Sequence, residues 1–304
     1  MTMAHRATAD IRRDGFRQLR NYVELCLTLS GQSRYRTFFE YALQKLEKAD
    51  SLYYSLIQCL LDTVEENRIC TAGVNFGLGG LVYGAAAIKE RREEGDDREA
   101  AWLHVANAAD PRLSVAVERV EQQNGYVWIL YVCSAAEVGT VVALAKKYPH
   151  IAFLMLLSPE CLQETTIELL QKRPNIVTLL LLQKPELSQH TIETAQNLRT
   201  KKLFYGFVTL LDEADCAAAL QPDWLDTLAK NALFCVYARR EGVCEETSEQ
   251  LRKAVIRHRV ELNAPLLLLD WDSDMKVLNH AIGADTVIGT ITTEADAFPL
   301  QIKQ

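Results

Sequence analysis

The chain has 304 residues with 33 Lys or Arg and 40 Asp or Glu, which gives a formal net charge of −7, and apolar types make up 49% of it. This composition is that of a soluble globular protein, and it excludes a disordered chain, a collagen and a small disulfide scaffold. Because a net acidic chain disfavours the clustered cationic surface that binds phosphates, we expect no nucleic acid partner.

The first part of the chain, to about residue 68, is expected to be helical. Its apolar residues, from Phe38 to Leu61, recur near helical spacing and show no strand-like alternation. The arginines before residue 20 are followed by no apolar stretch of the kind that signal peptides contain. We therefore expect an N-terminal helical region and a cytoplasmic location.

A glycine-rich segment follows, in which the twenty residues from Ile69 to Ile88 carry no charge. Its length would span a bilayer, but its five glycines, Thr71 and Asn75 lower its hydrophobicity, so we expect a buried loop and helix and no membrane span. Nine of the ten residues from Glu90 to Glu99 are charged and predict a solvated helix end and linker. The predicted units are therefore residues 1–99 and residues 100–304, the second with a short C-terminal extension.

The second unit contains short, continuously apolar runs that predict buried parallel strands. Seven runs share this character: Trp102 to Ala106, Val127 to Cys133, Ile151 to Leu157, Ile176 to Leu182, Leu203 to Leu210, Leu233 to Tyr237, and Leu266 to Asp270. Their starts are 24 to 33 residues apart, which is the length of a βα unit. The sequence therefore predicts an α/β fold with six or seven βα units.

Amphipathic stretches between these runs predict the helices. Ser158 and Pro159 resemble a helix cap and first turn, and Thr247 with Gln250 forms a capping-box pattern. The spacing alone leaves open whether the units curl into a barrel or form an open doubly wound sheet. No glycine-rich nucleotide fingerprint is present to favour the open sheet.

The eight cysteines form no CxxC or CxxxC pair anywhere in the chain. Zinc and iron–sulfur sites usually take two thiolates from one tight turn, so we expect reduced thiols and no metal site.

Functional side chains of parallel α/β folds lie at the carboxyl ends of the strands. The candidate ligand-binding residues at these ends are Asn107, Glu137, Arg239, Asp270 and Asp272. Asp270, Asp272 and Asp274 alternate, as ligands of magnesium or calcium could; the alternative is that Asp270 caps a helix or pairs with Arg239 or Arg240. His104, inside a predicted strand, is expected to be a packed histidine.

The order of these segments resembles the radical S-adenosylmethionine (SAM) superfamily. The segments that carry the resemblance are GVNFGLGGLVYGAAAIKE (residues 73–90), the strand that opens on Trp102, and LFYGFVTL, LFCVYARREG and LLLLDWDSD (residues 203–210, 233–242 and 266–274). The resemblance implies a partial TIM-type barrel with an iron–sulfur cluster and SAM at its mouth.

Three features of that family are missing. The loop after the first strand, residues 107–114, lacks the cysteines of the CxxxCxxC motif that hold the cluster. The family's GGEP motif would fall on residues 135–138, where only Glu137 matches, and residues 280–300 contain no cysteine for an additional cluster. The resemblance therefore implies a degenerate member of the superfamily.

We accordingly expect a non-catalytic binding or scaffold protein, whose partner is a peptide or another enzyme, with no cofactor. Two alternatives stay open. One is an enzyme of another class that uses the acidic and arginine side chains at the mouth, and the other is a protein that binds SAM without a cluster.

Overall fold

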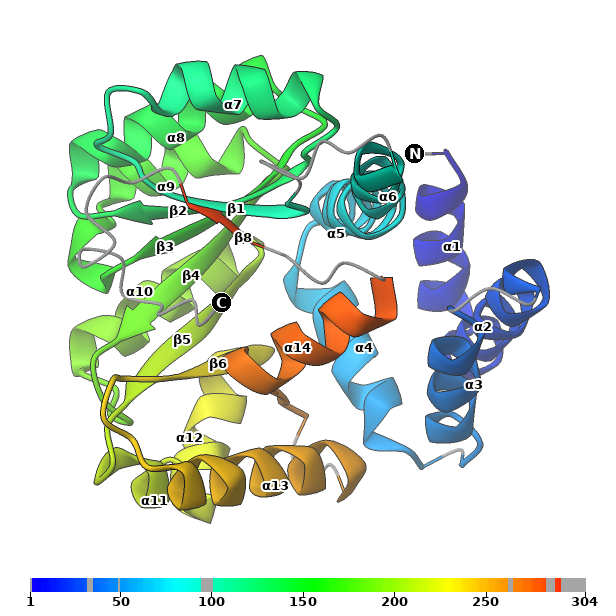
Figure 1. Ribbon diagram of the computed structural model, residues 1–304. Helices are drawn as coiled ribbons and strands as arrows, with labels where there is room; N and C mark the ends of the chain where they lie inside the picture. Colours follow the sequence, from blue (N-terminus) through cyan, green and yellow to red (C-terminus); the bar gives the residue numbers. More distant parts are fainter. Residues whose placement is uncertain are drawn as a thin grey trace.

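The computed structural model describes residues 2–31, 35–48, 50–93, 101–261, 265–282 and 288–290. It contains an N-terminal helical region, residues 2–93, followed by a parallel sheet with its connecting helices (Figure 1).

The helical region confirms the expected helices. Its elements are α1 (Thr2–Arg13), α2 (Gly15–Ser30), α3 (Arg36–Lys45), α4 (Leu52–Thr63), α5 (Glu66–Ala72), η1 (Gly73–Gly84) and α6 (Ala85–Glu93). The helices α2 and α3 contact each other but contain no buried residue. They form the outermost layer of this region.

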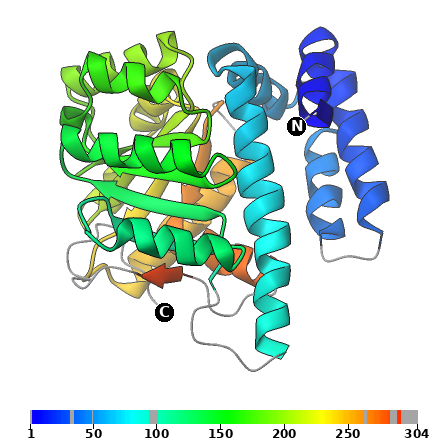
Figure 2. The ribbon, with the colours of Figure 1, turned by 90° about the horizontal axis from the view of Figure 1, so that it is seen from above.

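The glycine-rich segment is helical throughout, which corrects the expectation of a loop before the helix. Figure 2 shows α5, η1 and α6 as one continuous helix between the sheet and the first helices. Gly80 is needed for this packing, because a Cβ there would overlap the side chain of Val127. The stretch Glu66–Arg91 is long and apolar enough to cross a membrane, but 33% of its most apolar window is buried in the protein.

The sheet has eight strands, all parallel, in the order β7-β6-β5-β4-β3-β2-β1-β8. The strands are β1 (Leu103–Asn107), β2 (Val127–Val132), β3 (Ala152–Leu157), β4 (Ile176–Leu182), β5 (Tyr205–Leu211), β6 (Phe234–Arg239), β7 (Leu267–Asp270) and β8 (Ile288–Thr290). The strand β8 was not predicted. The order lacks the reversal of a doubly wound sheet, and among the described residues the sheet is open, with β7 and β8 as its edges.

Seven predicted strands are confirmed, β4 with its predicted ends and the others with ends shifted by at most two residues. Shifts of two residues occur in β6, which ends at Arg239 and not at Tyr237, and in β5, which begins at Tyr205 and not at Leu203. Leu203 is instead bonded through its N–H to the carbonyl of Leu198, at the end of the preceding helix.

The connecting helices are α7 (Leu113–Gln122), α8 (Ala135–Lys147), η2 (Pro159–Cys161), α9 (Glu164–Gln171), α10 (Gln189–Thr200), α11 (Asp215–Ala218), α12 (Pro222–Asn231), α13 (Glu245–Glu261) and α14 (Trp271–Ile282). Two predicted caps are wrong. Pro159 opens only a short turn, and α9 is capped by a box between Gln163 and Thr166. Thr247 lies inside α13, because that helix already begins at Glu245.

Two apolar layers hold the sheet. The outer layer joins one face to the helices α7 to α13 and includes Phe153, Phe207 and Leu251. The inner layer covers the other face with η1, α6 and α14 and includes Ile88, Val105 and Leu210. Strands that are buried on both faces explain why their sequences are continuously apolar.

Polar contacts join the continuous helix of α5, η1 and α6 to the sheet and its connecting helices. Arg68, only 1% exposed, donates to the carbonyls of Leu170, Gln171 and Arg173 at 2.6 to 2.9 Å, just where α9 ends. It therefore gives a donor to carbonyls at the end of a helix, of which those of Leu170 and Arg173 also accept a backbone N–H. The buried amide of Asn75 donates to the carbonyl of Pro149 at 2.9 Å, before β3.

Candidate functional site

The carboxyl ends of the parallel strands meet at one edge of the sheet, and all five predicted residues lie there. Asn107 ends β1, Arg239 ends β6 and Asp270 ends β7, while Glu137 and Asp272 lie in the first turns of α8 and α14. The structure brings Arg239, Asp270 and Asp272 together. Asn107 and Glu137 are not part of that cluster.

The Arg239 guanidinium is the centre of the cluster. Its Nη2 donates to Asp272 Oδ2 at 2.6 Å and to Asp270 Oδ1 at 3.3 Å, and its Nε donates to Asp272 Oδ2 at 3.0 Å. Nη1 donates to the carbonyl of Ser248 in α13 at 3.1 Å. The side chains of Arg239 and Asp270 are 12% and 2% exposed, so this ion pair is buried. Arg239 thus joins β6 to α13 and α14.

Asp270 also caps a helix. Its Oδ1 accepts the N–H of Ser273 at 3.0 Å, in the first turn of α14, and its own N–H donates to Asp274 Oδ2 at 2.7 Å. These contacts confirm the alternative in which Asp270 caps a helix and pairs with Arg239. Burial raises the pKa of Asp270 above its ordinary value, although Ser273 and Arg239 lower it in part. Its Oδ2 is buried and has no hydrogen-bond partner.

The third carboxylate of the alternating set has its own arginine. Asp274 Oδ1 accepts from Arg259 Nη1 at 2.8 Å. Two guanidinium groups therefore pair with the three carboxylates that a divalent cation would need. In the part of the chain that the structure describes, no group of three or more His, Cys, Asp or Glu side chains is arranged to hold a metal ion.

Arg239 and Asp270 face the outer layer of the fold. Side chains alternate along a strand, and Tyr237 in β6 and Leu268 in β7 belong to the outer core. Arg239 and Asp270 lie two positions further along the same strands, so they share that face. The cluster therefore lies between the sheet and its outer helices, and the inner face of the sheet ends in other residues.

Glu137 also forms hydrogen bonds at the start of a helix, α8. Its carboxylate accepts the N–H of Cys133 at 2.8 Å and the hydroxyl of Ser134 at 2.8 Å, and Ser134 is the residue that caps α8. Ser134 Oγ in turn accepts the N–H of Glu137 at 3.4 Å, so both side chains cap the start of α8. The match of Glu137 to the family's motif therefore has a sufficient explanation in local structure.

The inner face ends in a row of four polar residues, of which sequence reasoning had named only Asn107 as a ligand-binding residue. Alternate residues of a strand lie on the same face of the sheet. By this rule Cys133, Gln183 and Arg240 lie on the inner face just after β2, β4 and β6, and Asn107 lies on it at the end of β1. Arg240 Nη2 donates to Gln183 Oε1 at 2.6 Å. Asn107 Oδ1 is buried without a hydrogen-bond partner. We name these four residues the inner rim; counting positions from the buried strand centres could have found them.

The inner rim can bind a polar ligand but does not fit an iron–sulfur cluster. The loops after β2, β3, β5 and β6 carry one thiol each, Cys133, Cys161, Cys216 and Cys244, and the loop after β1 carries none. Burial raises the pKa of Cys161, and it raises the pKa of Cys216 to about 11. Since thiolates are the ligands of clusters, both shifts disfavour ligation.

A cavity of about 570 Å³ opens beside Arg239. Arg252 and Lys276 contribute positive charge to its lining, and Glu245 and Glu246 contribute negative charge. A lining with both signs of charge suits a polar ligand and gives no preference for an anion or a cation.

No family model and no curated protein matches the sequence. Solved structures that are similar include three of SuiB from Streptococcus suis, a member of the radical SAM superfamily that the sequence resembles. SuiB bound to S-adenosylmethionine is 13% identical, with 55% of this chain and 47% of that chain covered and a TM-score of 0.45. SuiB bound to its precursor peptide SuiA is 11% identical, with 61% and 52% covered and a TM-score of 0.47. The chain spans about half the length of these structures.

Proposed function

We propose that this protein is a binding or scaffold protein that recognises a peptide or a partner enzyme and performs no radical chemistry. The observation that carries the proposal is the placement of the thiols. The loop after β1 has no cysteine, and each of four other strand loops has only one. One-electron cleavage of SAM requires a ligated cluster, and three ligands from one loop are not available here.

The ionisable groups at the carboxyl edge support the same proposal. Arg239 pairs with Asp270 and Asp272, and Glu137 caps a helix. Groups committed to holding the fold together are poor candidates for acid–base chemistry, which needs a proton that the substrate can reach. The inner rim keeps neutral donors and acceptors and one arginine, which suit recognition of a polar surface.

Anaerobic reconstitution with iron and sulfide tests this proposal. We expect less than one iron per chain after desalting and no charge-transfer absorbance, and no thermal shift at saturating SAM. Iron and sulfide in stoichiometric amounts, with that absorbance, would overturn the proposal. The variant Cys133→Ser is the control, because iron held adventitiously by an exposed thiol is lost in it while the folded protein is retained.

A further inference from the structure

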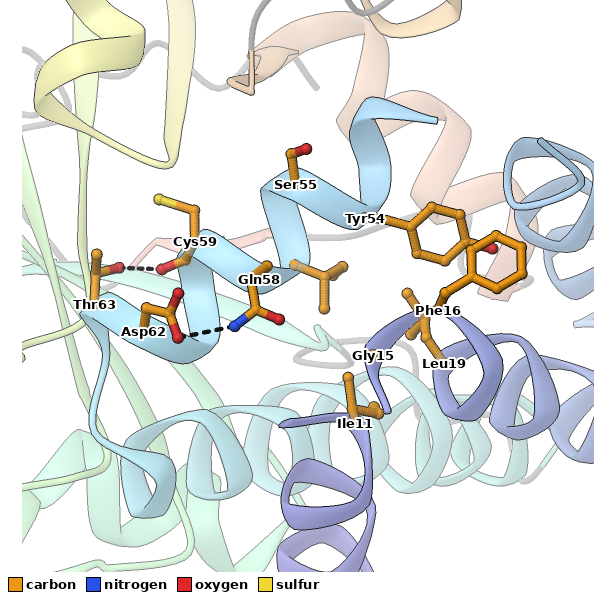
Figure 3. Close-up of a pocket in the computed structure, with 11 residues that line it drawn as sticks. Ile11, Gly15, Phe16, Leu19, Tyr54, Ser55, Gln58, Cys59, Asp62 and Thr63 are labelled. Atoms are coloured by element: carbon orange, nitrogen blue, oxygen red, sulfur yellow. Dashed lines mark hydrogen bonds between the residues drawn. The ribbon is translucent and has the colours of Figure 1, made fainter. Parts of the chain in front are cut away.

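A second cavity, of about 550 Å³, lies in the helical region (Figure 3). It is formed between the corner where α1 meets α2 and the side of α4. Ile11, Phe16 and Leu19 line it from the corner, and Ile57 lines it from α4. Its volume is within the range of pockets that bind small molecules and peptide side chains. We call this cavity the corner groove.

The lining of the corner groove carries one charged side chain, that of Asp62. Gln58 Nε2 donates to Asp62 Oδ1 at 2.9 Å, and both side chains line the groove (Figure 3). Asp62 is exposed, and among the residues that the structure describes its carboxylate has no ion pair with a cation. An apolar wall beside a carboxylate without a cation partner complements a ligand that is apolar and cationic.

The walls of the corner groove are held in place by the fold. Arg12, at the end of α1, donates to the carbonyl of Leu61 at 2.8 Å and to Glu66 Oε2 at 2.7 Å. The ring centroids of Phe16 in α2 and Tyr54 in α4 lie 4.5 Å apart, so the two helices are in contact there. A groove that already has its shape loses little conformational entropy on binding, which favours affinity.

We propose that the corner groove binds a segment of a partner protein in which a leucine-like side chain lies beside a lysine or arginine. The apolar side chain contacts Phe16, Leu19 and Ile57, and the cation pairs with Asp62. This inference rests on the proposed binding role, and it places the partner on the helical region, away from the carboxyl edge. Its failure can be distinguished from failure of the reconstitution experiment, because the groove lies between α1, α2 and α4, away from the strand ends at which that experiment tests for iron and SAM.

The test uses the full chain and a fluorescein-labelled nonapeptide of leucine and lysine, with binding measured by fluorescence anisotropy. We expect Asp62→Asn to weaken binding two- to fivefold, since an exposed ion pair contributes up to about 1 kcal/mol. Ile57→Gln should weaken it about tenfold by removing apolar contact. Asp226→Asn, at an exposed position in the middle of α12, is the matched control and should change nothing. Circular dichroism confirms that each variant is folded.

Two results would overturn the proposal. One is equal affinity for a nonapeptide in which glutamate replaces lysine, because charge complementarity would then play no part. The other is sedimentation that shows a dimer of the wild type and a monomer of Asp62→Asn, because the groove would then hold a second copy of this chain.

Discussion

The sheet and the helical region are stabilised in different ways. Every residue of β4 and β5 is buried, whereas α2 and α3 contain no buried residue. The sheet is held by apolar layers on both faces. The helical region contributes η1 and α6 to the inner layer, packs Leu56 of α4 near Leu233, and is further joined to the sheet by the polar contacts of Arg68 and Asn75. We therefore expect substitutions at the junction to separate the two regions before the sheet itself unfolds.

The largest effect is expected for Arg68→Ala. The substitution removes a buried cation and its hydrogen bonds to the carbonyls of Leu170, Gln171 and Arg173. We expect a loss of about 3 to 5 kcal/mol in the free energy of unfolding, measured by urea denaturation. Hydrogen exchange should rise first in residues 2–63 and later in the strands.

The control for Arg68 is Arg17→Ala, in which an exposed arginine of α2 is removed. It should change the free energy of unfolding by no more than about 0.5 kcal/mol. Uniform exchange throughout Arg68→Ala would show that the two regions unfold as one unit.

The next effect concerns pH and His104, which lies where α6 approaches β1. The ring is 4% exposed and stacked on Trp128, and burial lowers its pKa to about 4. The unfolded chain binds a proton near pH 6.5 and the folded chain does not, so stability is lost as the pH falls from 6.5 to 4. At pH 4 the shifted pKa of His104 lowers the free energy of unfolding by about 3 kcal/mol.

The variant His104→Gln should flatten this part of the stability profile, measured by urea denaturation at several pH values. The exposed His190 offers the comparison, since His190→Gln should leave the slope unchanged. An unchanged slope in His104→Gln would mean that other groups cause the acid sensitivity.

The smallest effects are expected at two glycines of η1, where substitution by alanine should change the free energy of unfolding in opposite directions. At Gly80 a Cβ would overlap Val127, so Gly80→Ala should lower the free energy of unfolding by about 1 to 2 kcal/mol. At Gly77 a Cβ would meet nothing within 4 Å, so Gly77→Ala should raise it by up to about 1 kcal/mol through helix propensity. Thermal unfolding measures both, and the same sign for both would contradict the close packing of η1 on β2.

The sequence was sufficient to predict β1 to β7 because parallel strands that are buried on both faces consist of continuous apolar runs. It did not predict β8, whose three residues, Ile288–Thr290, are too few to stand out as such a run. It also predicted a loop in the glycine-rich segment, since glycine disfavours helices in isolation. There the contact with Val127, which is distant in sequence, decides the conformation.

The candidate site was predicted in part. The pairing of Arg239 with Asp270 follows from their places at the ends of adjacent strands, and the structure confirms it. The face on which they lie depends on the start of each strand, and an error of one residue moves a side chain to the other face. For that reason Arg240, an alternative predicted partner of Asp270, instead lies on the inner face, where it pairs with Gln183.

The order of the strands has one more consequence. From β1 to β7 the neighbours in the sheet are also neighbours along the chain, whereas β8 pairs with β1. A cut between β4 and β5 would therefore divide two ladders, β4 with β5 and β1 with β8, and would leave the other five pairings inside one fragment or the other. The protein is built like a stack of repeats, in which the chain could be divided into two complementing halves at the loop that contains Pro185.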